Sequence, residues 1–149
     1  MARVTFNNAD YCLPVAGFSH AVQSDRPGRH LFVSGLLTER RGPAKDKVTW
    51  YDENEEATVE AEGDVEMQTR RIMESLKRIL AEAGGTLDDV VRVVIYLVDL
   101  DDYMLVHKVR MEYFGDEPPA STCVEVSRLY DPRQLIEIEA TAIIPSAVG

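Results

Sequence analysis

The sequence has few cysteines, few basic residues and no long apolar run, and each shortage excludes a class of protein. Its two cysteines, Cys12 and Cys123, are too few for a disulfide scaffold, so we expect a protein of the reducing cytoplasm. No window is apolar for the length of a membrane span, and the first residues lack the hydrophobic core of a signal peptide. Lys and Arg number 16 against 26 Asp and Glu, and the net charge of −10 disfavours nucleic-acid binding.

The remaining composition is typical of a globular domain, with 45% hydrophobic and 28% charged residues. The length of 149 residues predicts one domain that spans residues 1–149. Residues 39–63 form a long polar excursion within it, and the alternation in 47–51 predicts a short strand there. The acidic part of this excursion, 52–62, is either a solvated surface or a surface that binds another protein.

Hydrophobic periodicity predicts the order ββ-α-β-α-ββ, an α+β fold in which helices cover one face of a mixed sheet. Asp64 is expected to cap the first helix, and Gly84-Gly85 to end it. A turn at Pro27-Gly28 is expected to join the first two strands as a hairpin. The predicted strands are 19–24, 31–37, 90–98, 118–126 and 135–142, and the predicted helices are 64–83 and 101–114.

The predicted strand 90–98 is apolar on both faces. Helices can cover only one face of the sheet, so a monomer would leave the other apolar face in water. We therefore expect the second face to contact other subunits of the same protein.

The last two strands carry polar side chains with a period of two residues. Ser121 and Cys123 share one face of their strand, and Glu137, Glu139 and Thr141 share one face of theirs. If the two strands are neighbours, these groups lie together on the side away from the aliphatic core. That side is then either a binding site or an ordinary solvated face.

The chain resembles the RidA/YjgF/UK114 family from about Gly17 to Ile144. The resemblance implies a chorismate-mutase-like α+β fold, a homotrimer with three clefts between subunits, and no metal or cofactor. The best-known members are deaminases that hydrolyse 2-aminoacrylate and related imines or enamines. The motifs that carry the resemblance, in the family's order, are Gly17-Phe18-Ser19-His20-Ala21-Val22, Leu31-Phe32-Val33-Ser34-Gly35, Gln68-Thr69, Ala83-Gly84-Gly85, Asp88-Asp89-Val90-Val91, Tyr113-Phe114, Pro119-Ala120 and Ile136-Glu137-Ile138-Glu139-Ala140.

The resemblance also implies site residues. Glu137 matches the carboxylate that orients or activates the attacking water, and Ser34 and Cys123 agree with the family's cleft. Phe18 stands where deaminases commonly have tyrosine, and His107 where they usually have asparagine. We interpret Cys123 as a small inert thiol of the cleft rather than a nucleophile. His107 is either an acid/base or anion-binding group near Glu137 or a surface histidine.

Ser121 is the main departure, because the deaminases have an arginine there that binds the substrate carboxylate. Serine cannot supply that charge, so we expect weak or absent turnover of 2-aminoacrylate unless another cation replaces it. Arg70, Arg71 and Arg92 are the candidate replacements.

We therefore predict hydrolysis of a small imine, an enamine or a related metabolite in the cleft between subunits. The alternative is a non-catalytic protein that binds or senses a small ligand with the same cleft. A weaker alternative is a protein that protects others through its acidic excursion. His20 and His30 lack metal-ligand spacing with each other or with a cysteine, so we predict no metal site.

Overall fold

The computed structural model describes residues 3–6, 18–19, 21–24, 27–38, 40–41, 58–59 and 61–146. The α-helices and strands, in chain order, are β1 (Arg3–Phe6), β2 (Ala21–Ser24), β3 (Gly28–Leu36), β4 (Arg40–Arg41), β5 (Thr58–Val59), α1 (Val65–Glu82), β6 (Val90–Leu97), α2 (Tyr103–Phe114), β7 (Ala120–Glu125) and β8 (Ile136–Pro145). Short 3₁₀ turns at Leu87–Asp89 and Leu100–Asp102 precede β6 and α2.

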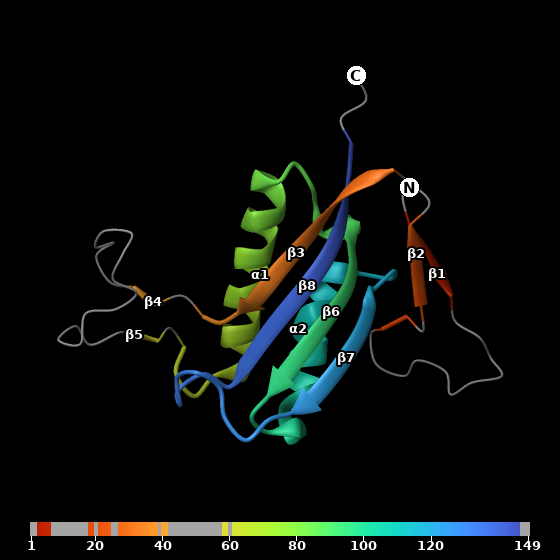
Figure 1. The fold of residues 1–149 in the computed structure, drawn as a ribbon. Helices are drawn as coiled ribbons and strands as arrows, with labels where there is room; N and C mark the ends of the chain where they lie inside the picture. Colours follow the sequence, from red (N-terminus) through yellow and green to blue (C-terminus); the bar gives the residue numbers. More distant parts are fainter. Residues whose placement is uncertain are drawn as a thin grey trace.

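A four-stranded mixed sheet in the order β3-β8-β6-β7 forms the centre of the fold, and both helices lie on one of its faces (Figure 1). The strands β6 and β7 are parallel, and α2 connects them, while β8 is antiparallel to both of its neighbours. This arrangement confirms the predicted mixed α+β fold with helices on one face.

The first helix has the boundaries and the buried stripe that its periodicity predicts. Asp64 accepts a hydrogen bond from Met67 N at 2.9 Å and caps the helix, and Gly84 follows its end with φ of +82°. Four side chains of the stripe, Ile72, Met73, Leu76 and Leu80, are fully buried. Truncating any of them to alanine would typically cost about 2–5 kcal/mol.

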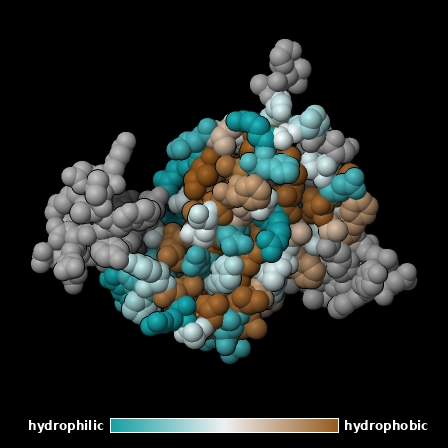
Figure 2. Space-filling view, viewed as in Figure 1, coloured by the Kyte–Doolittle hydropathy of each residue, from teal (hydrophilic) through white to brown (hydrophobic). Residues whose placement is uncertain are grey.

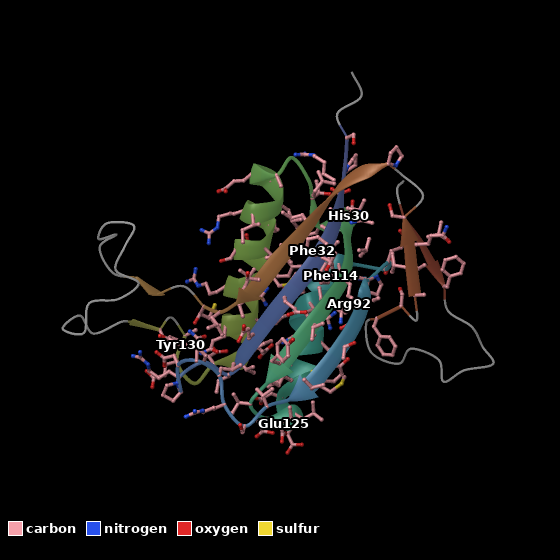
Figure 3. The ribbon with its side chains drawn as sticks, in the orientation of Figure 1. His30, Phe32, Arg92, Phe114, Glu125 and Tyr130 are labelled. Carbon is pink, nitrogen blue, oxygen red and sulfur yellow. The ribbon has the colours of Figure 1, made fainter. Side chains whose placement is uncertain are left out.

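The sheet face opposite the helices, which we call the open face, faces the viewer in Figures 1 to 3. Hydrophobic and hydrophilic residues alternate over it in Figure 2. Figure 3 places Phe32 of β3 and Arg92 of β6 on this face, and the Phe32 side chain is 76% exposed. Val124 of β7, which lies opposite Tyr96 on the same face, is 42% exposed, and exposed apolar residues that gather on one face are typical of a surface that another chain covers.

Two sequence predictions about the first strands are wrong or incomplete. The strands β2 and β3 do not form a hairpin: β2 pairs with β1, and β3 pairs with β8. Pairing β3 with the long β8 satisfies its backbone groups along most of its nine residues, which a short hairpin to β2 could not do. The sequence did not predict β1. The expected strand at 47–51 lies outside the described residues.

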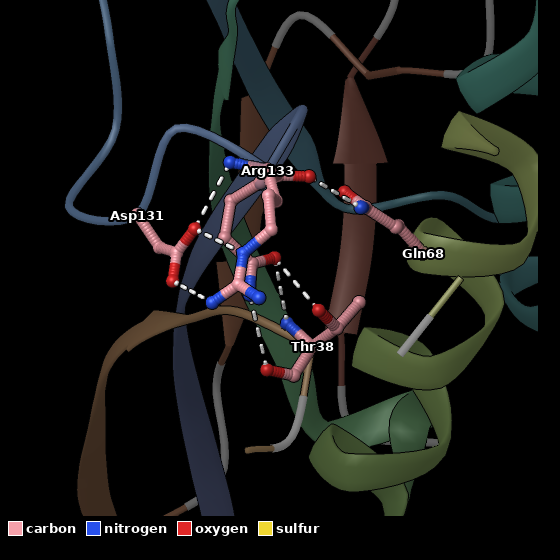
Figure 4. Close-up of polar contacts among 5 residues, drawn as sticks. Thr38, Gln68, Asp131 and Arg133 are labelled. Carbon is pink, nitrogen blue, oxygen red and sulfur yellow. Dashed lines mark hydrogen bonds and ion pairs between the residues drawn. The ribbon is translucent and has the colours of Figure 1, made fainter. Parts of the chain in front are cut away.

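A buried polar network fixes the segment that leads into β8 (Figure 4). Gln134 Oε1 accepts from Thr38 N at 3.2 Å and from Thr38 Oγ1 at 2.7 Å, and Gln134 Nε2 donates to Thr38 O at 3.3 Å. Gln68 of α1 donates to Arg133 O and accepts from Leu135 N. The network therefore ties β3, α1 and the start of β8 to one another just before Glu137.

Candidate functional site

The strand β7 turns Ser121 and Cys123 toward the helices, not toward the open face. In the parallel register Ser121 lies opposite Val93 and Cys123 opposite Ile95, and both β6 residues belong to the core. The expectation that these side chains share a face with Glu137 is therefore wrong within one chain. It assumed that the last two strands are neighbours, but β6 lies between them.

Arg110 of α2 lies directly behind Ser121. Its Nη2 donates a hydrogen bond to Ser121 Oγ at 3.2 Å, and its guanidinium lies over the ring of Phe114, with Cζ 5.8 Å from the centroid. The side chain is 1% exposed, and its Nε and Nη1 atoms have no hydrogen-bond partner among the described residues. A buried guanidinium that lacks acceptors is costly, so this arrangement calls for a functional explanation.

His107, one helical turn before Arg110, lies with its ring 6.4 Å from that of Tyr103 in a stacked arrangement. Its Nδ1 is buried and has no hydrogen-bond partner among the described residues. Burial and the nearby Arg110 charge lower the pKa of His107, so its imidazole is neutral at neutral pH. Neutral imidazole has one donor and one acceptor nitrogen, so it can donate a hydrogen bond to a polar ligand atom or accept one from it.

The Cys123 thiol is partly buried against the same helix. Burial raises the pKa of Cys123 despite the opposing charge of Arg110, so the thiol stays protonated at neutral pH. A protonated thiol is a poor nucleophile, in agreement with the interpretation of Cys123 as inert. We refer to Tyr103, His107, Arg110, Ser121 and Cys123 together as the edge cluster.

Phe18 lies next to the start of β7 because the residue that follows it bridges to that strand. Its neighbour Ser19 donates from its backbone N to Pro119 O at 3.3 Å and from its hydroxyl to Pro118 O at 2.8 Å. Ser19 also forms a parallel bridge with Ala120. These contacts place the partly buried Phe18 one residue from the strand that carries Ser121.

Glu137 lies on the open face, in contact with the backbone of β3. A Cβ added at Gly35 would lie 1.7 Å from Glu137 Oε1, so only glycine leaves room for this carboxylate. The β3–β8 register shifts between Val33 and Leu36, which places the exposed Ser34 and Gly35 at a bulge. Ser34, Gly35 and Glu137 therefore form one group.

Further polar side chains of the open face extend this group. Tyr96 Oη donates to Glu139 Oε2 at 3.3 Å, and Arg92 Nη1 lies 3.7 Å from Glu139 Oε1. Burial, and then the neighbouring Glu139, raise the pKa of Glu137 above the usual range of a carboxyl group. A carboxylate with a raised pKa beside a partly covered surface is a good candidate for a general base. We refer to Ser34, Gly35, Tyr96, Glu137 and Glu139 as the open-face cluster.

The sheet separates the two clusters within one chain. Glu137 and Ser34 lie on the open face, whereas His107, Ser121 and Cys123 lie on the helical side, at the edge formed by β7. Glu137 and His107 can therefore face one cavity only when they come from two copies of the chain.

None of the three arginines proposed from the sequence lies in the edge cluster. Arg70 pairs with Glu112 across the exposed surface of the two helices, and Arg92 lies beside Glu139 on the open face. Arg71 is exposed on α1. Sequence reasoning missed Arg110, although a signal was present: it falls four residues after Val106 and four before Phe114, on the apolar stripe of its helix.

No group of three or more His, Cys, Asp or Glu side chains among the described residues is arranged to hold a metal ion. Within the same residues, no helix is long and apolar enough to cross a membrane.

Comparison with known proteins places these features in a family. The chain is 38% identical over 130 residues to a RutC family protein of Pyrococcus abyssi, and this match covers 87% of each chain. It is 38% identical over 129 residues to the 3-aminoacrylate deaminase RutC of Acinetobacter baylyi, and this match covers 87% of this chain and 88% of that protein.

Solved structures show the same fold. The Rid family protein YyfB from Yersinia pestis has a TM-score of 0.74 at 32% identity, and the match covers 97% of this chain and 100% of that one. A member of the YjgF/YER057c/UK114 family from Mycobacterium tuberculosis has a TM-score of 0.60 at 28% identity, over 96% and 100% of the two chains. The family described as Endoribonuclease L-PSP matches residues 9–144, and the chain thus belongs to this family, which includes the RutC and RidA/YjgF proteins.

Proposed function

We propose that the protein hydrolyses the C=N bond of a small imine, or of the imine tautomer of an enamine, in a cleft between two copies of the chain. The observation that carries this proposal is the Glu137 carboxylate, held against the backbone of Gly35 with a raised pKa. A relative of similar length is named as a 3-aminoacrylate deaminase, and 3-aminoacrylate is an enamine.

In the proposed reaction, water adds to the imine carbon, the nitrogen is protonated, and the C–N bond breaks to give a carbonyl compound and ammonia. Glu137 accepts a proton from the attacking water, which its raised pKa favours. The protonated Glu137 passes this proton to the nitrogen, which gives a carbinolamine. The same carboxylate then takes the hydroxyl proton of the carbinolamine and passes it to the nitrogen as the C–N bond breaks, so that the carbonyl compound and ammonia leave and Glu137 is again ionised. Ser34 and Tyr96 can bind the water or the nitrogen from the same face.

The cleft requires two copies because one chain holds the two clusters on opposite faces of its sheet. We propose that the open-face cluster of one copy faces the edge cluster of the next in a homotrimer. The exposed Phe32 and the apolar residues of the open face supply the surface that such an assembly would cover. Phe18, Ser121, Cys123 and His107 then line the substrate-binding half, and Glu137 the catalytic half.

The rival function is a protein that binds a small ligand in this cleft without chemistry. The unpartnered donors of the edge cluster favour a ligand in either case. Turnover decides between the two functions.

The test is imine hydrolysis by the Glu137→Gln variant, with ammonia release as the readout. Loss of the general base is expected to lower kcat by about 10²-fold or more, while the trimer and its melting temperature are retained. In the wild type, kcat should fall as the pH drops through the raised pKa of Glu137, because the protonated carboxyl group cannot accept a proton. Equal turnover by wild type and variant would favour the ligand-binding function.

A further inference from the structure

The edge cluster contains a positive charge without a matching negative one. Arg110 is fully buried, and its guanidinium is protonated at neutral pH. Its described partners are the Ser121 hydroxyl, at 3.2 Å, and the face of Phe114, and no described carboxylate pairs with it. Two of its nitrogen atoms, Nε and Nη1, lack an acceptor in the described part of the chain. Such a cation destabilises the protein unless something supplies negative charge.

The surroundings of Arg110 show from which side that charge can come. On the helical side lies the apolar core, where Phe114 covers the guanidinium. On the other side lie Ser121, Cys123 and His107, which are only partly buried and border the edge of the sheet. Because Ser121 Oγ accepts from Arg110, its own hydroxyl proton is left to donate outward. The buried Nδ1 of His107 is a further unpartnered group one helical turn away.

We propose that Arg110 is the anion-recognition residue of the cleft, and that the ligand carries a carboxylate which binds at Ser121 with the Arg110 guanidinium behind it. The positive charge that Ser121 cannot supply from the strand is thus supplied from α2. This inference rests on the proposed cleft and names its substrate class: a small imino or enamino acid rather than a neutral imine. It replaces the expectation that a carboxylate substrate would bind poorly.

The geometry of Arg110 suits a single carboxylate. The Arg110 donors are fixed by packing against Phe114, which limits the entropy lost on binding. A single carboxylate would satisfy them and remove the cost of the isolated buried charge.

A pair of uncharged and charged probes of equal size tests the proposal. Butanoate and butanamide differ in charge and are not hydrolysed as imines, so the result is independent of turnover. Binding to the assembled wild-type protein is measured by NMR titration. We expect butanoate to bind at least ~10-fold more tightly than butanamide, and Arg110→Met to weaken butanoate binding by ~30-fold or more. Arg71→Met, which removes an exposed cation of the same type, is the matched control and should keep the preference.

Two further measurements secure the test. In wild type, the Nε–Hε resonance of Arg110 should shift on adding butanoate but not butanamide, a readout that remains if Arg110→Met fails to fold. The double variant Arg110→Met/Ser121→Arg moves the guanidinium to the strand and should restore the preference for butanoate. The proposal is overturned if wild type shows no preference, if Arg110→Met keeps it, or if the Arg110 resonance does not move. Imine turnover by a protein with no preference would leave the proposed hydrolysis intact and remove only Arg110 from recognition.

Discussion

Three side chains carry the proposed chemistry, and each depends on a neighbour. Glu137 depends on Gly35 for room, Ser121 depends on Arg110 for charge, and His107 owes its neutral state to burial and to the same arginine. A function assigned to one of these residues is therefore tested by changing its neighbour. The residue types alone would not show this, because a strand glutamate and a helix arginine are common surface residues.

Gly35→Ala should inactivate the protein without removing a functional group. The new Cβ would lie 1.7 Å from Glu137 Oε1, so the carboxylate must move away from its present position. A displacement of this size is expected to lower kcat by about 10²-fold. The double variant Gly35→Ala/Glu137→Gln is the control, because its kcat should equal that of Glu137→Gln alone. A further drop in the double variant would mean that Gly35 acts through something other than Glu137.

Packing between elements explains why the site has its geometry. The helix α2 connects the parallel strands β6 and β7, so it lies behind the strand whose inner side chains include Ser121 and Cys123. The Thr38–Gln134–Gln68 network fixes the segment that enters β8 and hence the position of Glu137. The helix α2 thus positions the edge cluster, and the hydrogen-bond network positions the open-face cluster.

Removing the centre of this network should destabilise the fold. Gln134→Leu leaves the backbone N and hydroxyl of Thr38 without an acceptor in a buried site. The free energy of unfolding, measured by urea denaturation, should fall by about 1–3 kcal/mol. The same substitution at the exposed Gln23 is the matched control and should change stability by no more than ~0.5 kcal/mol. Equal effects at the two positions would show that the network contributes nothing.

Periodicity predicted the elements well but not their partners. The stripe of α1, its Asp64 cap and the apolar strand β6 follow from local sequence, because each depends on residues a few positions apart. The pairing of β3 with β8 depends on contacts between distant segments, so Pro27-Gly28 was misread as a hairpin. Alternation showed that Ser121 and Cys123 share a face, but choosing which face requires the position of β7 beside β6. The sequence does not single out Arg110, because periodicity alone does not show that an arginine on an apolar stripe is buried.

At the level of assembly, we propose that no single chain contains a complete site. The open-face cluster and the edge cluster lie on opposite sides of one sheet, so each cleft needs two copies. A homotrimer has three such clefts and a mass of three times 16.7 kDa. Light scattering at micromolar concentration establishes whether the mass is that of a trimer.

Mixing two inactive variants shows whether two copies of the chain share one site. Glu137→Gln removes the base from the open-face cluster, and Ser121→Glu places a carboxylate beside Arg110 that occupies the proposed anion site. Each variant alone should lack imine hydrolysis. In mixed trimers formed from equal amounts, about a quarter of the clefts would combine an intact Glu137 with an intact edge cluster from the next copy. We expect recovery of about that fraction of wild-type activity; mixed trimers that form but stay inactive would show that the site is not shared between copies.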